Sequence, residues 1–175
     1  TIIVLADGLG SGVKANILST LTSKILSTMM AQGMKVEDCV ETIAQTLPVC
    51  SVRGVAYSTF TIIYIRDNDE ADIIQYDNPE VILLRNGQNY NYPQTVSDIC
   101  GKKISRSTIK LCEDDIFIAM SDGCIHASIG QELNFGWDRS EIIEFMESFW
   151  QVGFTAKTLN TILLDECFKL YGGQP

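Results

Sequence analysis

Two aspartate-glycine pairs are the residues of this sequence best placed to do chemistry. Asp7-Gly8 and Asp122-Gly123 each follow a largely apolar run of strand length. Such runs are typical of buried strands, so each pair places a carboxylate where a strand ends. Two strands of one sheet can bring both carboxylates to one point, where their charges repel unless a cation neutralises them. The pattern therefore predicts a site for a hard metal ion.

The residues around both pairs resemble two signature segments of metal-dependent protein phosphatases, the PPM family. Val4 to Gly12 reads VLADGLGSG, and Met120 to Gly123 reads MSDG. The sequence is most similar to the bacterial SpoIIE/RsbU/RsbX branch, in which an Asp-Gly-[Leu/Met]-Gly-Ser-Gly turn leads into a helix. The stretch from Arg53 to Thr59, followed by a strand, fits the same branch. The resemblance runs through the whole chain.

This resemblance implies roles for three residues. In the family, the first aspartate bridges two Mn²⁺ or Mg²⁺ ions, the carbonyl of its glycine is a ligand, and the second aspartate holds one ion. The matching residues are Asp7, Gly8 and Asp122, so we expect Asp7 and Asp122 to be catalytic as well as metal-binding. Hard divalent ions take oxygen ligands, and two of them can hold the attacking and leaving oxygens of a phosphoryl transfer. The resemblance implies direct attack of a metal-activated water on phosphoserine or phosphothreonine, without a phosphoenzyme.

The sequence also departs from the family pattern. The family has another acidic ligand upstream of the first strand and a Gly-Asp-Asp/Asn segment near its end, and neither occurs in this chain. The chain begins inside a strand pattern and stops after a helix, so we expect residues 1–175 to be a single phosphatase-like domain truncated at both ends and lacking flanking strands. Two metal ions are expected in the intact protein, but one or none in this stretch, because fewer carboxylates hold a divalent ion less tightly.

Four further residues are candidate contacts of a phosphate group or of the outer shell of the metal site. Lys14 and Arg53 offer cations to a phosphoryl group, although a solvated surface charge is the more common explanation for such residues. Gly123 belongs to the second turn. His126 stands four residues after Asp122, where relatives often carry an acid, and a lone histidine also has a purely structural explanation.

Charge and cysteine content narrow the possible partners and location. Twenty-two acidic residues against thirteen Lys and Arg give a net charge of −9, which disfavours nucleic acid and anionic membranes as partners. No apolar run approaches the ~20 residues that cross a bilayer. The six cysteines show no C-x-x-C spacing, which favours free thiols in a reducing compartment. We therefore expect a cytoplasmic protein with no membrane insertion.

Apolar periodicity predicts the elements that must position these residues. A strand over 2–6 precedes two helices over 13–29 and 36–47, then a run of antiparallel strands, then two helices opened by an Asp138-x-x-Glu141 capping box and by Thr155. We expect the inward face of the first helix to comprise Val13, Ile17, Leu18, Leu21, Ile25 and Met29.

The strands carry their own turn signals. Asn86-Gly87 predicts a type I′ hairpin turn, and residues 113–115 predict a turn between strands over 104–111 and 116–120. Helices and strands segregated in this way imply an α+β fold. The phosphatase resemblance implies more specifically a four-layer α-β-β-α sandwich of two mainly antiparallel sheets covered by helices.

Three classes of function follow. The sequence favours a metal-dependent serine/threonine protein phosphatase, and the branch it resembles implies phosphoprotein substrates of the anti-sigma-factor-antagonist (STAS) kind in bacterial stress or sporulation signalling. The alternative is a catalytically silent phosphatase-fold module that binds a signalling partner. A small nucleotide- or phosphate-binding module is disfavoured, because Gly8-x-Gly10-x-Gly12 is neither a G-x-G-x-x-G fingerprint nor a P-loop.

Overall fold

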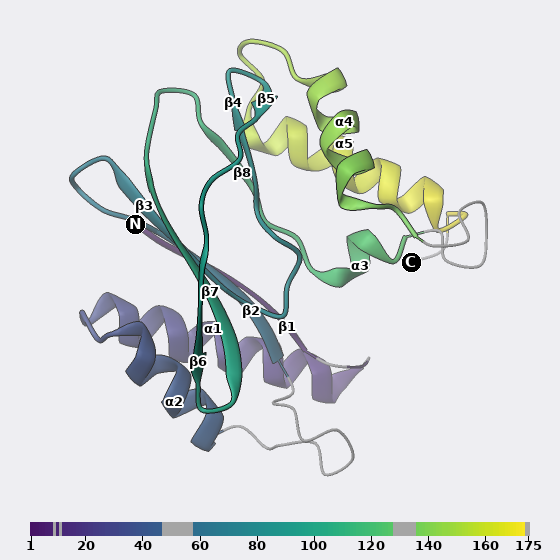
Figure 1. Ribbon diagram of the computed structural model, residues 1–175. Coiled ribbons are helices and arrows are strands. Elements are labelled where there is room, and N and C mark those ends of the chain that lie inside the picture. Colours follow the sequence, from purple (N-terminus) through teal and green to yellow (C-terminus); the bar gives the residue numbers. More distant parts are fainter. Residues whose placement is uncertain (9, 11, 47–57, 128–135, 174–175) are drawn as a thin grey trace. The chain divides into compact units, whose positions relative to one another are not determined.

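Helices and strands occur in separate blocks along the chain, as expected of an α+β fold. The structure, a computed structural model, describes residues 1–8, 10, 12–46, 58–127 and 136–173. The chain divides into two units (Figure 1): the first joins Thr1–Asn78 to Tyr92–Leu111, and the second joins Pro79–Asn91 to Cys112–Pro175.

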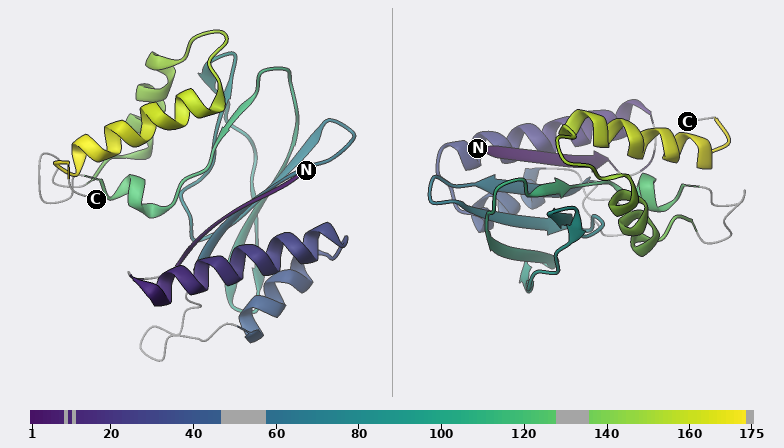
Figure 2. Two further views of the ribbon diagram at one scale, coloured as in Figure 1. Left: turned by 180° about the vertical axis from the view of Figure 1, so that it is seen from behind. Right: turned by 90° about the horizontal axis from the view of Figure 1, so that it is seen from above.

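The first unit contains a five-stranded sheet in the order β1-β2-β3-β7-β6, with every neighbouring pair antiparallel. Helices α1 and α2 lie against one face of this sheet (Figures 1 and 2). The elements are β1 (Ile2–Gly8), α1 (Val13–Ala31), α2 (Val36–Thr46), β2 (Ser58–Ile65), β3 (Glu70–Tyr76), β6 (Thr95–Ile99) and β7 (Lys102–Lys110).

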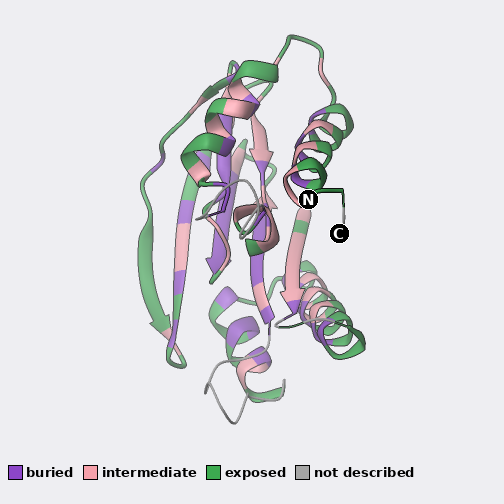
Figure 3. Ribbon diagram, turned by 90° about the vertical axis from the view of Figure 1, so that its right-hand side faces the viewer, coloured by how far each residue is buried: buried purple, intermediate pink, exposed green. Residues whose placement is uncertain are grey.

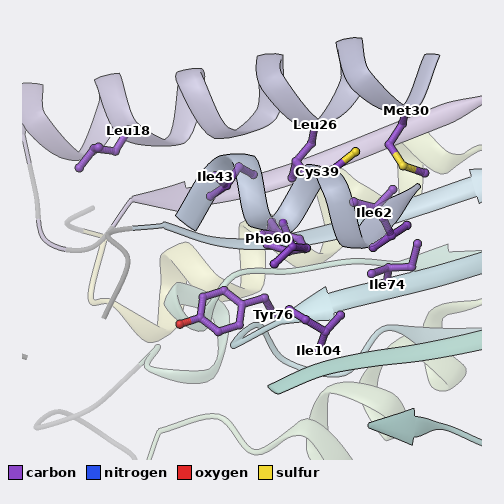
Figure 4. Packing of buried hydrophobic residues seen from close by; sticks show 12 residues of the cluster. Leu18, Leu26, Met30, Cys39, Ile43, Phe60, Ile62, Ile74, Tyr76 and Ile104 are labelled. Carbon is purple, nitrogen blue, oxygen red and sulfur yellow. The ribbon is translucent and has the colours of Figure 1, made fainter. Parts of the chain in front are cut away.

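The core of the first unit lies between the two helices and this sheet. Figure 4 shows Leu18 and Leu26 of α1 pointing toward the strands, where Phe60, Ile62 and Ile74 are all buried. The expected inward face of α1 was wrong in part. The buried residues of this helix are Ala15, Leu18, Thr22, Leu26 and Met30, whereas Val13, Ile17 and Leu21 are exposed. Apolar residues on several sides of α1 leave its periodicity ambiguous, so contact with the sheet decides which side is buried.

Strand β1 is less buried than the sequence predicts. Ile3 is exposed, and most of the strand is intermediate in exposure, whereas β2 and β3 beside it are largely buried (Figure 3). The reason is position: among the described residues β1 pairs with β2 alone, so it is an edge strand of this sheet.

The second unit contains a three-stranded antiparallel sheet in the order β5-β4-β8, with three helices. The elements are β4 (Ile82–Arg85), β5 (Gln88–Asn89), β8 (Ile116–Ile118), α3 (Asp122–Ile125), α4 (Arg139–Phe149) and α5 (Ala156–Leu170). A separate core joins residues of this sheet and these helices, among them Ile82, Leu84, Trp137, Ile142 and Leu163.

Local signals in this unit were confirmed. Asn86 and Gly87 have φ of 50° and 76°, as a type I′ turn requires. The capping box of Asp138 and Glu141 opens α4, and the Thr155 side chain accepts the N–H of Thr158 at the start of α5.

The turn expected around residue 113 is present, but the strands on either side of it do not pair with each other. β7 and β8 follow each other in the chain but lie in different sheets, so this turn does not join a hairpin. β7 pairs instead with β6, an edge strand that the sequence did not reveal. Thr95, Val96 and Ser97 of β6 are all exposed, and a strand without a buried side lacks the apolar alternation by which strands are recognised.

No helix in the described part of the chain combines the length and the apolar character needed to span a membrane.

Candidate functional site

The first Asp-Gly pair lies at the end of β1, in the first unit. Asp7 pairs with Thr59 and Gly8 with Ser58 across the β1–β2 ladder. The buried Ser58 hydroxyl donates to the main-chain carbonyl of Asp7 at 2.8 Å. Ladder and hydroxyl together fix the backbone that carries the carboxylate, and sequence reasoning missed this role of Ser58.

The Asp7 side chain is half-buried, and it makes no hydrogen bond or ion pair with any residue of the described ranges. Carboxylate oxygens are donors that hard divalent cations take, so a side chain that no described residue bonds suits a metal ligand.

Gly8 is required by packing. A Cβ at this position would lie 2.1 Å from the carbonyl oxygen of Ala15 in the first turn of α1. Only glycine lets the end of β1 approach the helix backbone so closely. Lys14, one residue before Ala15, is exposed.

The second Asp-Gly pair opens the short helix α3 in the second unit. The helix forms because main-chain bonds close it: the N–H of His126 donates to the carbonyl of Asp122 at 2.8 Å. His126 Nε2 lies 3.8 Å from Asp122 Oδ2, and both side chains are largely exposed. His126 therefore neighbours the candidate ligand, and a protonated imidazole would compete with a cation for it.

The Gly123 carbonyl accepts a hydrogen bond from a residue that the sequence did not indicate. The Tyr171 hydroxyl, just beyond α5, donates to the Gly123 carbonyl at 2.7 Å. Burial raises the pKa of the Tyr171 phenol, and Cys167, Cys124 and Asp122 raise it further. The phenol therefore stays protonated at neutral pH and can act as a donor.

Cys124 lies beside Cys167 in the core of the second unit. A hydrogen bond from the Cys167 thiol lowers the pKa of Cys124, and burial opposes that shift. The same bond, with burial, raises the pKa of Cys167.

The predicted site residues divide between the two units. Asp7, Gly8 and Lys14 belong to the first unit, and Asp122, Gly123 and His126 belong to the second. Arg53 lies outside the described residues. Within the described ranges, no three His, Cys, Asp or Glu side chains gather into a metal-binding group. Carboxylates and a carbonyl are the kind of donors that Mn²⁺ or Mg²⁺ takes, and each unit carries some of them.

The sequence was compared with known protein families and with curated proteins. The family model described as stage II sporulation protein E (SpoIIE) matches residues 1–166. A search among curated proteins gave no significant match.

Several solved structures share the fold. The phosphatase domain with a regulatory fragment of SpoIIE from Bacillus subtilis matches with a TM-score of 0.74 at 20% identity, over 99% of this chain and 50% of that one. The RsbU and RsbW domains of a Mycobacterium tuberculosis protein match with a TM-score of 0.70 at 18% identity, over 97% of this chain and 46% of that one. PppA of Pseudomonas aeruginosa, a regulatory component of its type VI secretion system, matches with a TM-score of 0.64 at 16% identity, over 99% of this chain and 82% of that one.

Proposed function

The chain belongs to the stage II sporulation protein E (SpoIIE) family, and from this membership we propose that it is the phosphatase domain of a metal-dependent serine/threonine phosphoprotein phosphatase. The observation that carries the proposal is the pair of Asp-Gly turns. One ends a strand beside a helix that packs on it. The other opens α3, which begins at Asp122, shortly after β8 ends at Ile118. The chain spans about half of the first structure it resembles, so the activity of the whole protein is part of the proposal.

Each candidate residue has a role in this proposal. Asp7 and Asp122 would supply carboxylate oxygens, and Gly8 would supply its carbonyl, to Mn²⁺ or Mg²⁺. A SpoIIE phosphatase structure from Bacillus subtilis was presoaked with Mn. When bound, such ions neutralise phosphoryl oxygens and lower the pKa of water. Ser58 holds the Asp7 backbone, and Gly8 allows α1 to lie against it. Lys14, Arg53, Gly123 and His126 remain candidates for contact with the phosphate or the outer shell.

The finer fold and the cellular setting are proposed on the same basis. We propose that the chain forms one domain with a four-layer α-β-β-α arrangement and that further strands flank it. We also propose that the protein is cytoplasmic. The substrate proposed is a phosphorylated STAS-type protein in stress or sporulation signalling. Likeness to an RsbU domain supports this choice among phosphoproteins.

Metal dependence provides the test of this function. We expect the full-length protein to release phosphate from a phosphoserine protein and from a small aryl phosphate only with added Mn²⁺ or Mg²⁺, because both turns offer hard oxygen donors. Phosphate release is measured during metal titration and after excess chelator.

Two outcomes would contradict the proposal. Undiminished hydrolysis in excess chelator would exclude a metal-dependent reaction. Binding of a phosphoprotein without hydrolysis at any metal concentration would favour the catalytically silent module instead. That alternative is consistent with the described ranges, in which no three acidic, His or Cys side chains form a metal-binding group.

A further inference from the structure

The Gly123 carbonyl has a donor from a distant part of the second unit. Tyr171 and Gly123 are 48 residues apart, and their hydrogen bond is 2.7 Å long. In a longer helix this carbonyl would accept the main-chain N–H four residues on. That N–H belongs to Ala127 and bonds instead to the carbonyl of Cys124 at 3.3 Å. Tyr171 therefore supplies to the Gly123 carbonyl the hydrogen-bond donor that α3 is too short to supply.

The end of α5 holds the Tyr171 ring in place. Tyr171 caps the helix, and its own N–H donates to the Cys167 carbonyl at 3.0 Å. Gly172 and Gly173 follow with φ of 67° and 74°, left-handed conformations that glycine adopts without strain. The N–H of Gly173 returns to the Phe168 carbonyl at 2.9 Å. The ring also packs against the core of the second unit, so its hydroxyl does not extend from a free chain end.

The Asp122 carboxylate depends on its backbone for direction. Its side chain is 65% exposed, and among the described residues its one ion-pair neighbour is His126, at 3.8 Å. An exposed side chain with so little side-chain support is oriented by the peptide groups on either side of it. Tyr171 bonds the carbonyl of Gly123, the next residue in the chain, and so holds the peptide group that follows the Asp122–Gly123 peptide.

We propose that Tyr171 is a positioning residue of the metal site, whose hydroxyl holds the Asp122-Gly123 backbone and thereby orients the Asp122 carboxylate for a cation. The inference rests on the proposed function. A ligand oriented before the ion arrives loses less freedom on binding, and groups that orient ligands commonly tune metal affinity. Tyr171 acts through the backbone and has no contact with substrate in this role.

Removal of the one hydroxyl tests the inference. In the full-length protein, Tyr171→Phe should raise the Mn²⁺ concentration for half-maximal activity by about three- to tenfold, as expected for one net hydrogen bond. At saturating Mn²⁺ its kcat should stay within about twofold of the unmodified protein. Direct Mn²⁺ binding by calorimetry should weaken in parallel. Tyr90→Phe is the matched control, because Tyr90 lies in the same unit and its hydroxyl bonds no described residue.

Each outcome bears on the inference. An unchanged Mn²⁺ requirement in Tyr171→Phe would overturn it, and so would an equal loss at all Mn²⁺ concentrations together with a lowered Tm, which would indicate a role in folding alone. If the unmodified protein neither binds Mn²⁺ nor hydrolyses phosphate, the proposed function fails and this inference fails with it. If the unmodified protein does both and Tyr171→Phe matches it, the inference alone fails.

Discussion

Substitution of Asp7 by Asn in the full-length protein is expected to lower kcat/KM for a phosphoprotein by at least about 10²-fold. The change keeps the shape of the side chain and removes its negative charge. A divalent cation loses a strong ligand, whereas no hydrogen bond or ion pair to a described residue is lost. Activity should therefore fall without a fall in Tm. Steady-state phosphate release and thermal unfolding measure the two effects separately.

The control for this prediction is Asp67→Asn. Asp67 is exposed in the turn between β2 and β3, at the end of the sheet opposite to Asp7. This variant removes the same charge and should retain the activity of the unmodified protein. Equal activity of Asp7→Asn and Asp67→Asn would exclude Asp7 from the metal site.

The largest expected effect on stability belongs to Gly8→Ala. The added Cβ would lie 2.1 Å from the Ala15 carbonyl oxygen and 2.7 Å from the carbonyl carbon. These are backbone atoms of α1, so the strand end and the helix must separate. Overpacking of this kind costs about 1–3 kcal/mol or more, which lowers Tm by roughly 2–4 °C for each kcal/mol in a chain of this length. Activity should fall as well, because the shift moves the neighbouring Asp7.

Gly123→Ala is the matched control for stability. It makes the same substitution after the other aspartate, where a Cβ would meet only the Ser121 hydroxyl oxygen at 3.6 Å, an ordinary contact. Alanine is favoured over glycine within a helix by up to about 1 kcal/mol, so Tm should stay level or rise. A Tm for Gly8→Ala equal to that of the unmodified protein would show that β1 and α1 do not approach as described.

The sequence predicts the fold well where a signal is local. The capping box of α4, the Thr155 cap of α5 and the Asn86-Gly87 turn each depend on residues a few positions apart, and all three were confirmed. The buried side of α1 and the pairing of β6 with β7 depend on which surface each element meets. Neither a helix with apolar residues on several sides nor an exposed edge strand carries that information in its own residues.

The same contrast between local signals and distant contacts holds for the candidate site. The two Asp-Gly pairs stand out because their residues are adjacent and each follows an apolar run. The hydroxyls that hold them do not stand out, since Ser58 lies 51 residues from Asp7 and Tyr171 lies 48 residues from Gly123. Serine and tyrosine are ordinary residues in strands and near helix ends, so only the folded chain reveals these two contacts.

A crystal structure of the full-length protein soaked with Mn²⁺, with anomalous scattering measured for the metal, tests the central claim most directly. We expect anomalous density in contact with oxygens of both Asp7 and Asp122, with the two carboxylates within roughly 7 Å of each other, since one or two ions join them. Carboxylates more than about twice that distance apart, or manganese bound where neither aspartate contacts it, would exclude a metal site made by these two residues.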